Sequence, residues 1–322
     1  MDLSIVTTLY RSAAYLPEFH RRACAAAEQL GLEFEVVYVN DGSPDDSQAV
    51  VETICDRDPR ARALELSRNF GHHKAMMTGL ADARGELVFL IDCDLEEAPE
   101  WLADFHRSLA ETRADTVYGV QERRKGGMWE RLAGSLFYRL FLLLANNCPL
   151  PRDQVTARLM RRRYVRSLVQ HQDREVFLAG LWAITGFRQV PRTVHKLSKG
   201  TTTYNLSRKL AIFFNALTSF STAPLRGIFY LGCLILVLTT VAATGALAQW
   251  IFGRVFSGWT SVIISIWLLG GLSLFALGMN GIYLAKVFAE VKRRPYTIVR
   301  SVYGRQAGLV EEHDDRRHLQ AG

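Results

Sequence analysis

The sequence predicts an α/β fold, in which a mostly parallel sheet with helices on both faces is followed by interfacial amphipathic helices and two transmembrane helices. Two observations carry this prediction. Short apolar runs alternate with helical stretches over residues 3–120, an order typical of a parallel sheet. Two long stretches without a charged residue then follow at 227–252 and 255–285, and each is long enough to cross a bilayer.

The apolar runs have the length of strands. Those predicted to form the sheet are residues 3–9, 34–40, 61–66, 86–91 and 116–120. The helices predicted between them lie near residues 14–30, 44–55, 72–83 and 99–110. In such a sheet, ligands bind at the carboxyl ends of the strands. No GxGxxG follows the first strand and no GxxxxGK[ST] occurs, so neither a dinucleotide-dependent dehydrogenase nor a P-loop ATPase is indicated.

The two uncharged stretches predict membrane spans near residues 227–250 and 261–285. Their connection holds one basic residue, Arg254, whereas basic residues crowd the outer ends: Arg208, Lys209, Arg226, Lys286, Lys292, Arg293 and Arg294. The positive-inside rule therefore places both termini in the cytoplasm and the short hairpin outside. The chain opens directly on a strand, so no cleavable signal peptide is expected. A buried helical hairpin is the alternative, but stretches this long with flanking charge disfavour it.

Composition narrows the partners of the protein. The net charge of +7 arises from 39 Lys and Arg against 32 Asp and Glu, and basic residues gather beside the apolar stretches. This distribution favours an anionic membrane surface over nucleic acid, and no RNA-binding motif is present. Five scattered cysteines without CxxC spacing argue against a disulfide framework and against a zinc site, so the soluble part is expected to be cytosolic and reduced; they are Cys24, Cys55, Cys93, Cys148 and Cys233.

Acidic residues follow two of the predicted strands. Asp92 and Asp94 end the apolar run 87–91, and alternation along an extended strand would turn both carboxylates to one side. Paired carboxylates of this kind hold a divalent cation that carries a diphosphate. Asp41 follows an earlier strand and could face the base or ribose of a nucleotide. Capping of the next helix is the preferred interpretation for three nearby residues, Ser43, Asp45 and Asp46.

Four motifs occur in order: Asn40–Ser47, Leu66–Gly71, Asp92–Glu96 and Val117–Val120. Together they resemble the family 2 glycosyltransferases of GT-A fold. Within that family the chain is similar to polyprenyl-phosphate glycosyltransferases, such as dolichyl-phosphate mannosyltransferases and bacterial undecaprenyl-phosphate glucosyltransferases. Later pieces also fit this subgroup, as does the terminal pair of spans: Phe177–Leu181, Thr185–Gln189 and Thr218–Leu225. The resemblance covers about residues 1–290, and the ordered series is more specific than any single motif.

The resemblance implies a set of site residues. Mg²⁺ or Mn²⁺ would be held by Asp92, Asp94 and Glu96, where Glu96 stands for the usual glutamine. The residues implied in binding the nucleotide sugar donor are Thr8, Tyr10, Asp41, Arg68, Asp92 and Cys93. His72 and His73 point about 100° apart on a helix and are poor joint metal ligands, so they are expected either to be structural or to contact the residues that bind the metal.

The acceptor side is expected on amphipathic helices. Residues 128–146 carry apolar side chains at helical spacing and arginines on the other face, which suits a membrane interface. In the resembled family a helix here binds the acceptor phosphate, so the candidates are Arg131 and Ser135, with Arg123 or Arg124; Arg131 is also a candidate catalytic residue. Arginine offers phosphate a planar fork of donors. A second such helix is expected at 206–221, preceded by residues that would attract an anionic substrate: His195, Lys196 and Lys199.

The resemblance implies an inverting transfer of sugar from a nucleoside diphosphate to a polyprenyl phosphate, at the cytoplasmic face of a bacterial-type inner membrane and in the service of cell-envelope glycans. A lipid monophosphate has its second pKa near 6 and needs no strong base. Two alternatives stay open: another membrane acceptor, or a nonenzymatic membrane partner of a glycan export complex. The presence of only two spans and the absence of QxxRW disfavour a processive synthase. Related membrane enzymes suggest assembly into homo-oligomers.

Three segments depart from the family pattern. Thr8–Ser12 replaces the usual Pro-x-Tyr-Asn-Glu, Thr156 stands where an aspartate is common in Gly-Asp-Phe-Arg-Leu, and Thr203 stands where a lysine is expected. The predicted division of the chain is a GT-A domain (1–165), an acceptor-side and juxtamembrane segment (166–224), a transmembrane hairpin (225–290) and a cytoplasmic tail (291–322).

Overall fold

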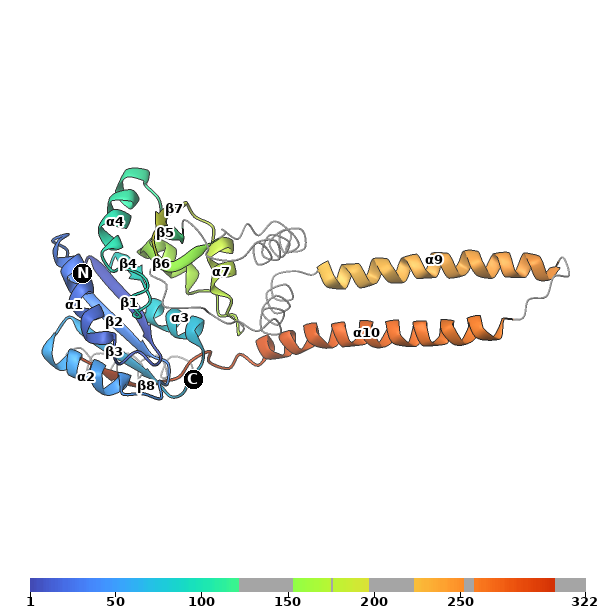
Figure 1. Cartoon of the computed structure of the whole chain (residues 1–322), viewed down its shortest axis with the longest axis horizontal. Helices are drawn as coiled ribbons and strands as arrows, with labels where there is room; N and C mark the ends of the chain where they lie inside the picture. The colour runs from blue at the N-terminus through green and yellow to red at the C-terminus, as the bar shows by residue number, and fades with distance from the viewer. Residues whose placement is uncertain (122–152, 175, 197–222, 252–257, 305–322) are drawn as a thin grey trace, which may run out of the picture. The chain divides into compact units, whose positions relative to one another are not determined.

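A computed structural model describes residues 1–121, 153–174, 176–196, 223–251 and 258–304 (Figure 1). The chain divides into two compact units. One contains the described residues up to 196 together with those from Arg294 onward, and the other contains the two long helices that precede Arg294.

An eight-stranded sheet forms the first unit, in the order β7-β5-β6-β4-β1-β2-β3-β8. The strands are β1 (Leu3–Leu9), β2 (Phe34–Asn40), β3 (Ala61–Leu66), β4 (Leu87–Leu90), β5 (Thr116–Gln121), β6 (Gln154–Arg161), β7 (Gln189–Val194) and β8 (Val299–Tyr303). β1 pairs in parallel with both β2 and β4, and β2 pairs in parallel with β3. Only β6 and β8 run antiparallel to their described neighbours. The predicted mostly parallel α/β sheet is therefore confirmed.

Helices cover both faces of this sheet (Figure 1). They are α1 (Leu16–Glu28), α2 (Ser47–Arg57), α3 (His72–Asp82), α4 (Trp101–Thr112), α6 (Arg162–Leu168) and α7 (Leu178–Ile184). Every residue of β1 is buried, as expected for a parallel strand covered on both sides. Ile5 shares a core cluster with Phe19 of α1, whereas Val6 faces Gly79 of α3 on the opposite side. The alternation of strand side chains thus separates two apolar layers.

Strands β6, β7 and β8 were not predicted. β6 lies within the predicted domain of 1–165, whereas β7 belongs to the predicted segment 166–224 and β8 to the predicted tail 291–322. β8 pairs antiparallel with β3, and Arg300 donates hydrogen bonds to Glu65 and to the Ser67 carbonyl. The Ser67 amide in turn donates to the Ile298 carbonyl at 2.9 Å.

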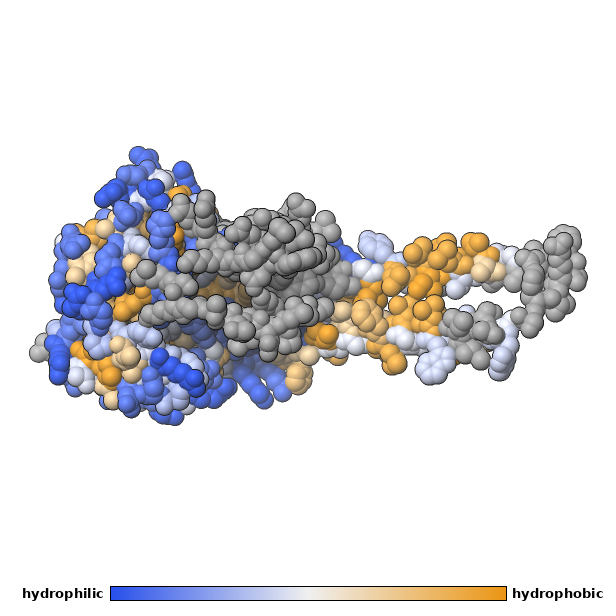
Figure 2. All heavy atoms as spheres, viewed as in Figure 1, coloured by the Kyte–Doolittle hydropathy of each residue, from blue (hydrophilic) through white to orange (hydrophobic). Residues whose placement is uncertain are grey.

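The second unit holds α9 (Ala223–Ile251) and α10 (Trp259–Val291). Figure 2 shows apolar residues in orange over both helices. Mean hydropathy is 2.0 over Leu225–Ala242 and 1.6 over Ser265–Val291, and the side chains there are not buried within the protein. By length and composition both helices are able to cross a membrane, and they contain the spans predicted at 227–250 and 261–285.

Candidate functional site

The candidate site lies at the carboxyl edge of the sheet. Because β1 pairs in parallel with β2 and with β4, the residues that follow these strands come to one edge. A pocket of about 290 Å³ is found there. Its lining contains three predicted donor residues and three others: Thr8, Tyr10 and Asp41, with Leu9, Asn69 and His72.

Asp41 holds the loop that precedes α3. Its buried carboxylate accepts hydrogen bonds from the Phe70 amide at 2.7 Å and the Gly71 amide at 3.0 Å. Burial raises the pKa of Asp41, against the opposing effect of these two hydrogen bonds. The carboxylate therefore holds the backbone next to α3 while Asp41 lines the pocket, and its contact with a nucleotide stays a prediction.

Gly42 allows the loop that precedes α3 to lie close to the backbone that follows β2. Its φ is +59°, and a Cβ atom at this position would lie 2.5 Å from the Asn69 nitrogen and 2.6 Å from the Arg68 carbonyl carbon. Arg68 itself is exposed, and its guanidinium lies 4.1 Å from the centroid of the Phe70 ring. The backbone of the loop, more than the Arg68 side chain, is fixed at the edge of the pocket.

Asp92 contacts His72, which agrees with the second of the two roles expected for this histidine, contact with a residue predicted to bind the metal. Asp92 Oδ1 lies 3.3 Å from His72 Nε2, and the other ring nitrogen of His72 lies 3.0 Å from Thr8 Oγ1. Burial opposes ionisation of both groups, but their mutual attraction prevails: the pKa of Asp92 is lowered and the pKa of His72 is raised. His73, in contrast, faces the Val176 carbonyl at 3.0 Å, in agreement with a structural role.

The two acids lie on a turn. β4 ends at Leu90, so Asp92 and Asp94 follow the strand, and the strand alternation used to align their carboxylates does not extend to them. The turn passes through Leu95 with φ of 62°, and the Glu96 amide donates to Asp94 Oδ1 at 2.9 Å. Burial raises the pKa of Asp94, and the neighbouring Asp92 and Glu96 carboxylates add to this effect.

The acidic cluster consists of Asp92, Asp94, Glu96 and Glu97, with Lys196 beside it. Sequence reasoning had not assigned Glu97 or Lys196 to this cluster. Lys196 Nζ lies 3.3 Å from Glu96 Oε2 and 3.5 Å from Glu97 Oε1. Glu97 is wholly buried, and burial raises its pKa to about 7. Its carboxylate accepts hydrogen bonds from the Thr156 and Ala157 amides at 3.0 and 2.8 Å. Three acids within residues 94–97 could have indicated Glu97 from the sequence. Lys196 could not have been found in this way, because it follows β7, far along the chain.

The donor atoms of this cluster are of the type that a hard divalent cation prefers. Asp92, Asp94 and Glu96 offer carboxylate oxygens, which Mg²⁺ and Mn²⁺ prefer. Asp92 Oδ1 is buried, and no described residue donates a well-directed hydrogen bond to it. An acceptor atom withdrawn from water in this way is suited to binding a cation.

One predicted donor residue, Cys93, faces elsewhere: its thiol is buried and donates to the Thr8 carbonyl at 3.2 Å. Tyr10, which lines the pocket, is 48% exposed. The predicted acceptor residues Arg123, Arg124, Arg131 and Ser135 lie outside the described part of the chain.

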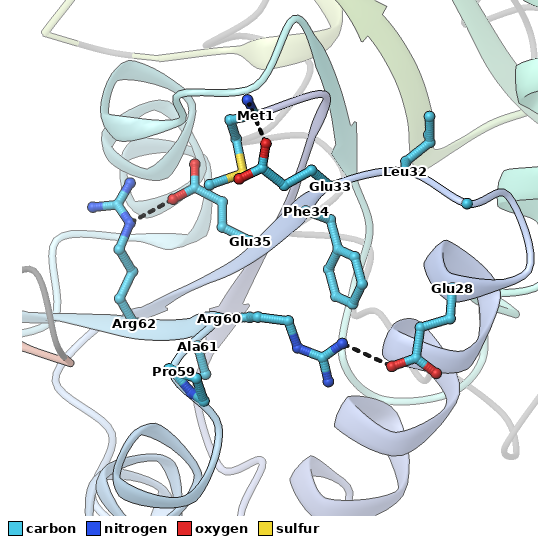
Figure 3. A pocket seen from close by; sticks show the side chains of 11 residues that line it. Met1, Glu28, Leu32, Glu33, Phe34, Glu35, Pro59, Arg60, Ala61 and Arg62 are labelled. Carbon is cyan, nitrogen blue, oxygen red and sulfur yellow. Dashed lines mark hydrogen bonds and ion pairs between the residues drawn. The ribbon is translucent and has the colours of Figure 1, made fainter.

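A larger hollow of about 510 Å³ lies at the amino edge of the sheet (Figure 3). Phe34 and Ala61, the first residues of β2 and β3, line it, and Arg60 pairs there with Glu28 at 2.7 Å. Acids and bases are balanced along its wall, and the buried carboxylates that follow β4 are at the other edge. We therefore assign the candidate site to the smaller pocket.

The parallel sheet, the strand order and the acid-bearing carboxyl edge define a glycosyltransferase of GT-A type. A family model for glycosyl transferase family 2 matches residues 4–169, and the chain belongs to this family. A Mycobacterium tuberculosis protein named as a glycosyltransferase is 52% identical, over 94% of this chain and 89% of its own. A prophage bactoprenol glucosyl transferase homolog of Escherichia coli is 29% identical, over 94% and 99%. Residues 1–349 of Staphylococcus aureus TarS superpose with a TM-score of 0.45 at 20% identity, covering 68% of this chain and 65% of that one.

Lys196→Met is expected to increase the affinity of the protein for Mn²⁺ about 10-fold in the absence of nucleotide. The substitution removes the cation that compensates Glu96 and Glu97, so the carboxylates attract a divalent ion more strongly. Isothermal titration with Mn²⁺ measures the change. The double variant Lys196→Met with Glu96→Gln is expected to return toward the wild-type affinity. Equal affinities of the single variant and the wild type would contradict the compensating role.

Proposed function

We propose that this glycosyltransferase moves a sugar from a nucleoside diphosphate sugar to a polyprenyl phosphate at the cytoplasmic face of a bacterial-type inner membrane. One observation supports the acceptor above all others. The relatives named bactoprenol glucosyl transferases match this chain along 93–94% of its length, and the match therefore extends beyond the sheet into the region of α9 and α10. The product would serve glycan modification of the cell envelope.

The donor is proposed to bind at the carboxyl edge, in the pocket beside Asp41. Thr8 and His72 line this pocket and orient Asp92, because His72 contacts both of them. Asp92, Asp94 and Glu96 would hold Mg²⁺ or Mn²⁺, which neutralises charge on the departing nucleoside diphosphate. Lys196 supplies a further positive charge next to these carboxylates. Burial lowers the pKa of Lys196, but Glu97, Asp92 and Glu96 raise it by more, so the ammonium stays charged.

The acceptor phosphate is proposed to bind Arg131 and Ser135, with Arg123 or Arg124. Its oxygen attacks the anomeric carbon while the bond to the diphosphate breaks, which inverts the configuration at that carbon. Because the phosphate is already ionised at cytosolic pH, the site needs no strong general base. The carboxylates of the cluster are held by backbone amides and by Lys196 and His72, which agrees with a site that has no strong general base.

The orientation in the membrane is also part of the proposal. α9 and α10 would span the bilayer, with the sheet and both termini in the cytoplasm, because basic residues flank the outer ends of the two helices. The short connection between the two helices would then lie outside.

A transfer assay with the purified full-length protein in detergent tests the proposal. The assay contains polyprenyl phosphate, Mg²⁺ or Mn²⁺, and a panel of labelled nucleotide sugars. Label is expected to reach the lipid from one donor, with inverted anomeric configuration by NMR, and to be lost with a chelator. Label that reaches another lipid-linked acceptor instead would replace the polyprenyl phosphate. Metal-dependent nucleotide binding without transfer to any lipid would favour the nonenzymatic membrane partner.

A further inference from the structure

Three potential metal ligands meet between α1 and the end of α2. His20 and Cys24 are one turn apart on α1 and share a face of that helix. Asp58 directly follows α2, which packs beside α1. His20 Nε2 lies 3.2 Å from Asp58 Oδ2, and Cys24 Sγ lies 3.7 Å from His20 Nε2 and 3.9 Å from Asp58 Oδ2. The nitrogen, sulfur and oxygen atoms thus form a small triangle.

The triangle has the size of one face of a tetrahedral zinc site. Zinc ligands lie about 2.0 to 2.3 Å from the ion, so neighbouring ligand atoms in a tetrahedron are about 3.3 to 3.6 Å apart. The three observed distances lie within a few tenths of an ångström of these values. Side chains of the cluster are partly accessible, with His20 16% and Asp58 14% exposed, so water can reach the fourth position.

Two further residues, Tyr38 and Arg60, form hydrogen bonds with the ligands. The Tyr38 hydroxyl lies 2.8 Å from His20 Nδ1, and when it accepts the Nδ1 proton, Nε2 keeps a free lone pair. Cys24 Sγ lies 3.8 Å from Nδ1 and 3.7 Å from Nε2, so metal binding has to turn the imidazole ring to bring this lone pair toward the sulfur. Arg60 donates to Asp58 Oδ1 through its backbone amide at 2.9 Å and to Oδ2, the oxygen that faces the triangle, through its guanidinium at 2.8 Å. Metal-binding histidines and carboxylates in proteins are commonly oriented by such outer hydrogen bonds.

We propose that His20, Cys24 and Asp58 form a second metal site, which binds one Zn²⁺ with water as the fourth ligand. A thiolate, an imidazole and a carboxylate together select zinc over Mg²⁺, which prefers oxygen. Binding replaces the thiol proton of Cys24, which is released to solvent. The ion joins α1 to the connection between α2 and β3.

This site is separate from the acidic cluster. Asp58 precedes the amino end of β3, whereas Asp92 and Asp94 follow the carboxyl end of β4. Both strands run in the same direction as β1, so the two sets of ligands belong to opposite edges of the sheet. The CxxC spacing searched for in the sequence could not reveal a site with a single cysteine, two ligands on α1 and a third after α2.

Binding of Co²⁺ to the full-length protein in detergent tests the proposal, with excess Mg²⁺ present to saturate the acidic cluster. One equivalent of Co²⁺ is expected to produce a thiolate-to-cobalt charge-transfer band, and one equivalent of Zn²⁺ is expected to abolish it. Cys24→Ser and His20→Gln should lose the band. Tyr38→Phe should keep it with an affinity about 10- to 100-fold weaker.

Cys55→Ser is the matched control, because Cys55 is as buried as Cys24, at 6% exposure, and belongs to α2. It should retain the band. Zn²⁺ should also raise the thermal unfolding midpoint of the wild type by about 5 °C and leave that of Cys24→Ser unchanged. Absence of a thiolate band in the wild type would overturn the proposal, as would its loss in Cys55→Ser, and neither result depends on the stability of the Cys24 and His20 variants.

Discussion

Asp92→Asn and Asp94→Asn are each expected to reduce sugar transfer about 10³-fold, which corresponds to roughly 4 kcal/mol of lost transition-state stabilisation. Each substitution keeps the shape of the side chain and removes one of the charges that would bind the metal. Asp92 is the more buried of the two, and the pKa of its carboxyl is lowered, against burial, by His72. A charged, ordered ligand is therefore lost in that variant.

Initial rates with saturating donor and acceptor measure this loss, together with Mn²⁺-dependent binding of the nucleotide sugar. Asp46→Asn is the control, since Asp46 is exposed before α2 and should leave both quantities unchanged. Rates within 10-fold of the wild type for both site variants, together with insensitivity to a chelator, would exclude the metal role of these residues.

Gly42→Ala is expected to destabilise the protein by about 3 kcal/mol and to reduce nucleotide affinity at least about 10-fold. The new Cβ would lie 2.5 Å from the Asn69 nitrogen, and the backbone there has a positive φ of +59°. Neither neighbour is a flexible side chain, so the loop has to move. That movement breaks the hydrogen bonds from the Phe70 and Gly71 amides to Asp41.

Gly31→Ala separates the two causes of this effect. Gly31 has a similar φ of +66°, but nothing lies within 4 Å of a Cβ atom built there. It should cost only about 1 kcal/mol and leave nucleotide binding intact. Thermal unfolding of the full chain and titration with nucleoside diphosphate compare the variants. Equal effects of Gly42→Ala and Gly31→Ala would show that backbone strain alone, and not the contact with the loop, is responsible.

The first half of the fold could be predicted because its strands are buried on both faces. Runs such as Leu3–Leu9 are rich in apolar and β-branched residues and are buried throughout. β6 was missed because arginines interrupt its apolar pattern, and yet Arg158 is wholly buried with its guanidinium 2.9 Å from the centroid of the Trp182 ring. β8 was missed because a short edge strand of mixed polarity has no local signal.

The candidate site could be predicted in part, because the order of the strands along the chain determines which residues lie at the carboxyl edge. The position of Asp41 and Asp92 after strands follows from the order of elements, so the sequence places them at one edge. The contact of His72 with Asp92, and that of Lys196 with Glu96 and Glu97, depend on how distant segments pack. No local pattern encodes such a contact, and the turn at Asp92–Asp94 replaced the strand geometry on which their alignment had been based.

The pairing of β8 with β3 has a consequence for how the chain folds during synthesis. β3 is complete after Leu66, but its outer partner comes only with residues 299–303, after both candidate membrane helices have left the ribosome. Until then one edge of β3 exposes unpaired amide and carbonyl groups, which invite pairing with other chains. Completion of the sheet therefore waits until α9 and α10 have been synthesised, and a chain that ends before residue 299 retains an open edge.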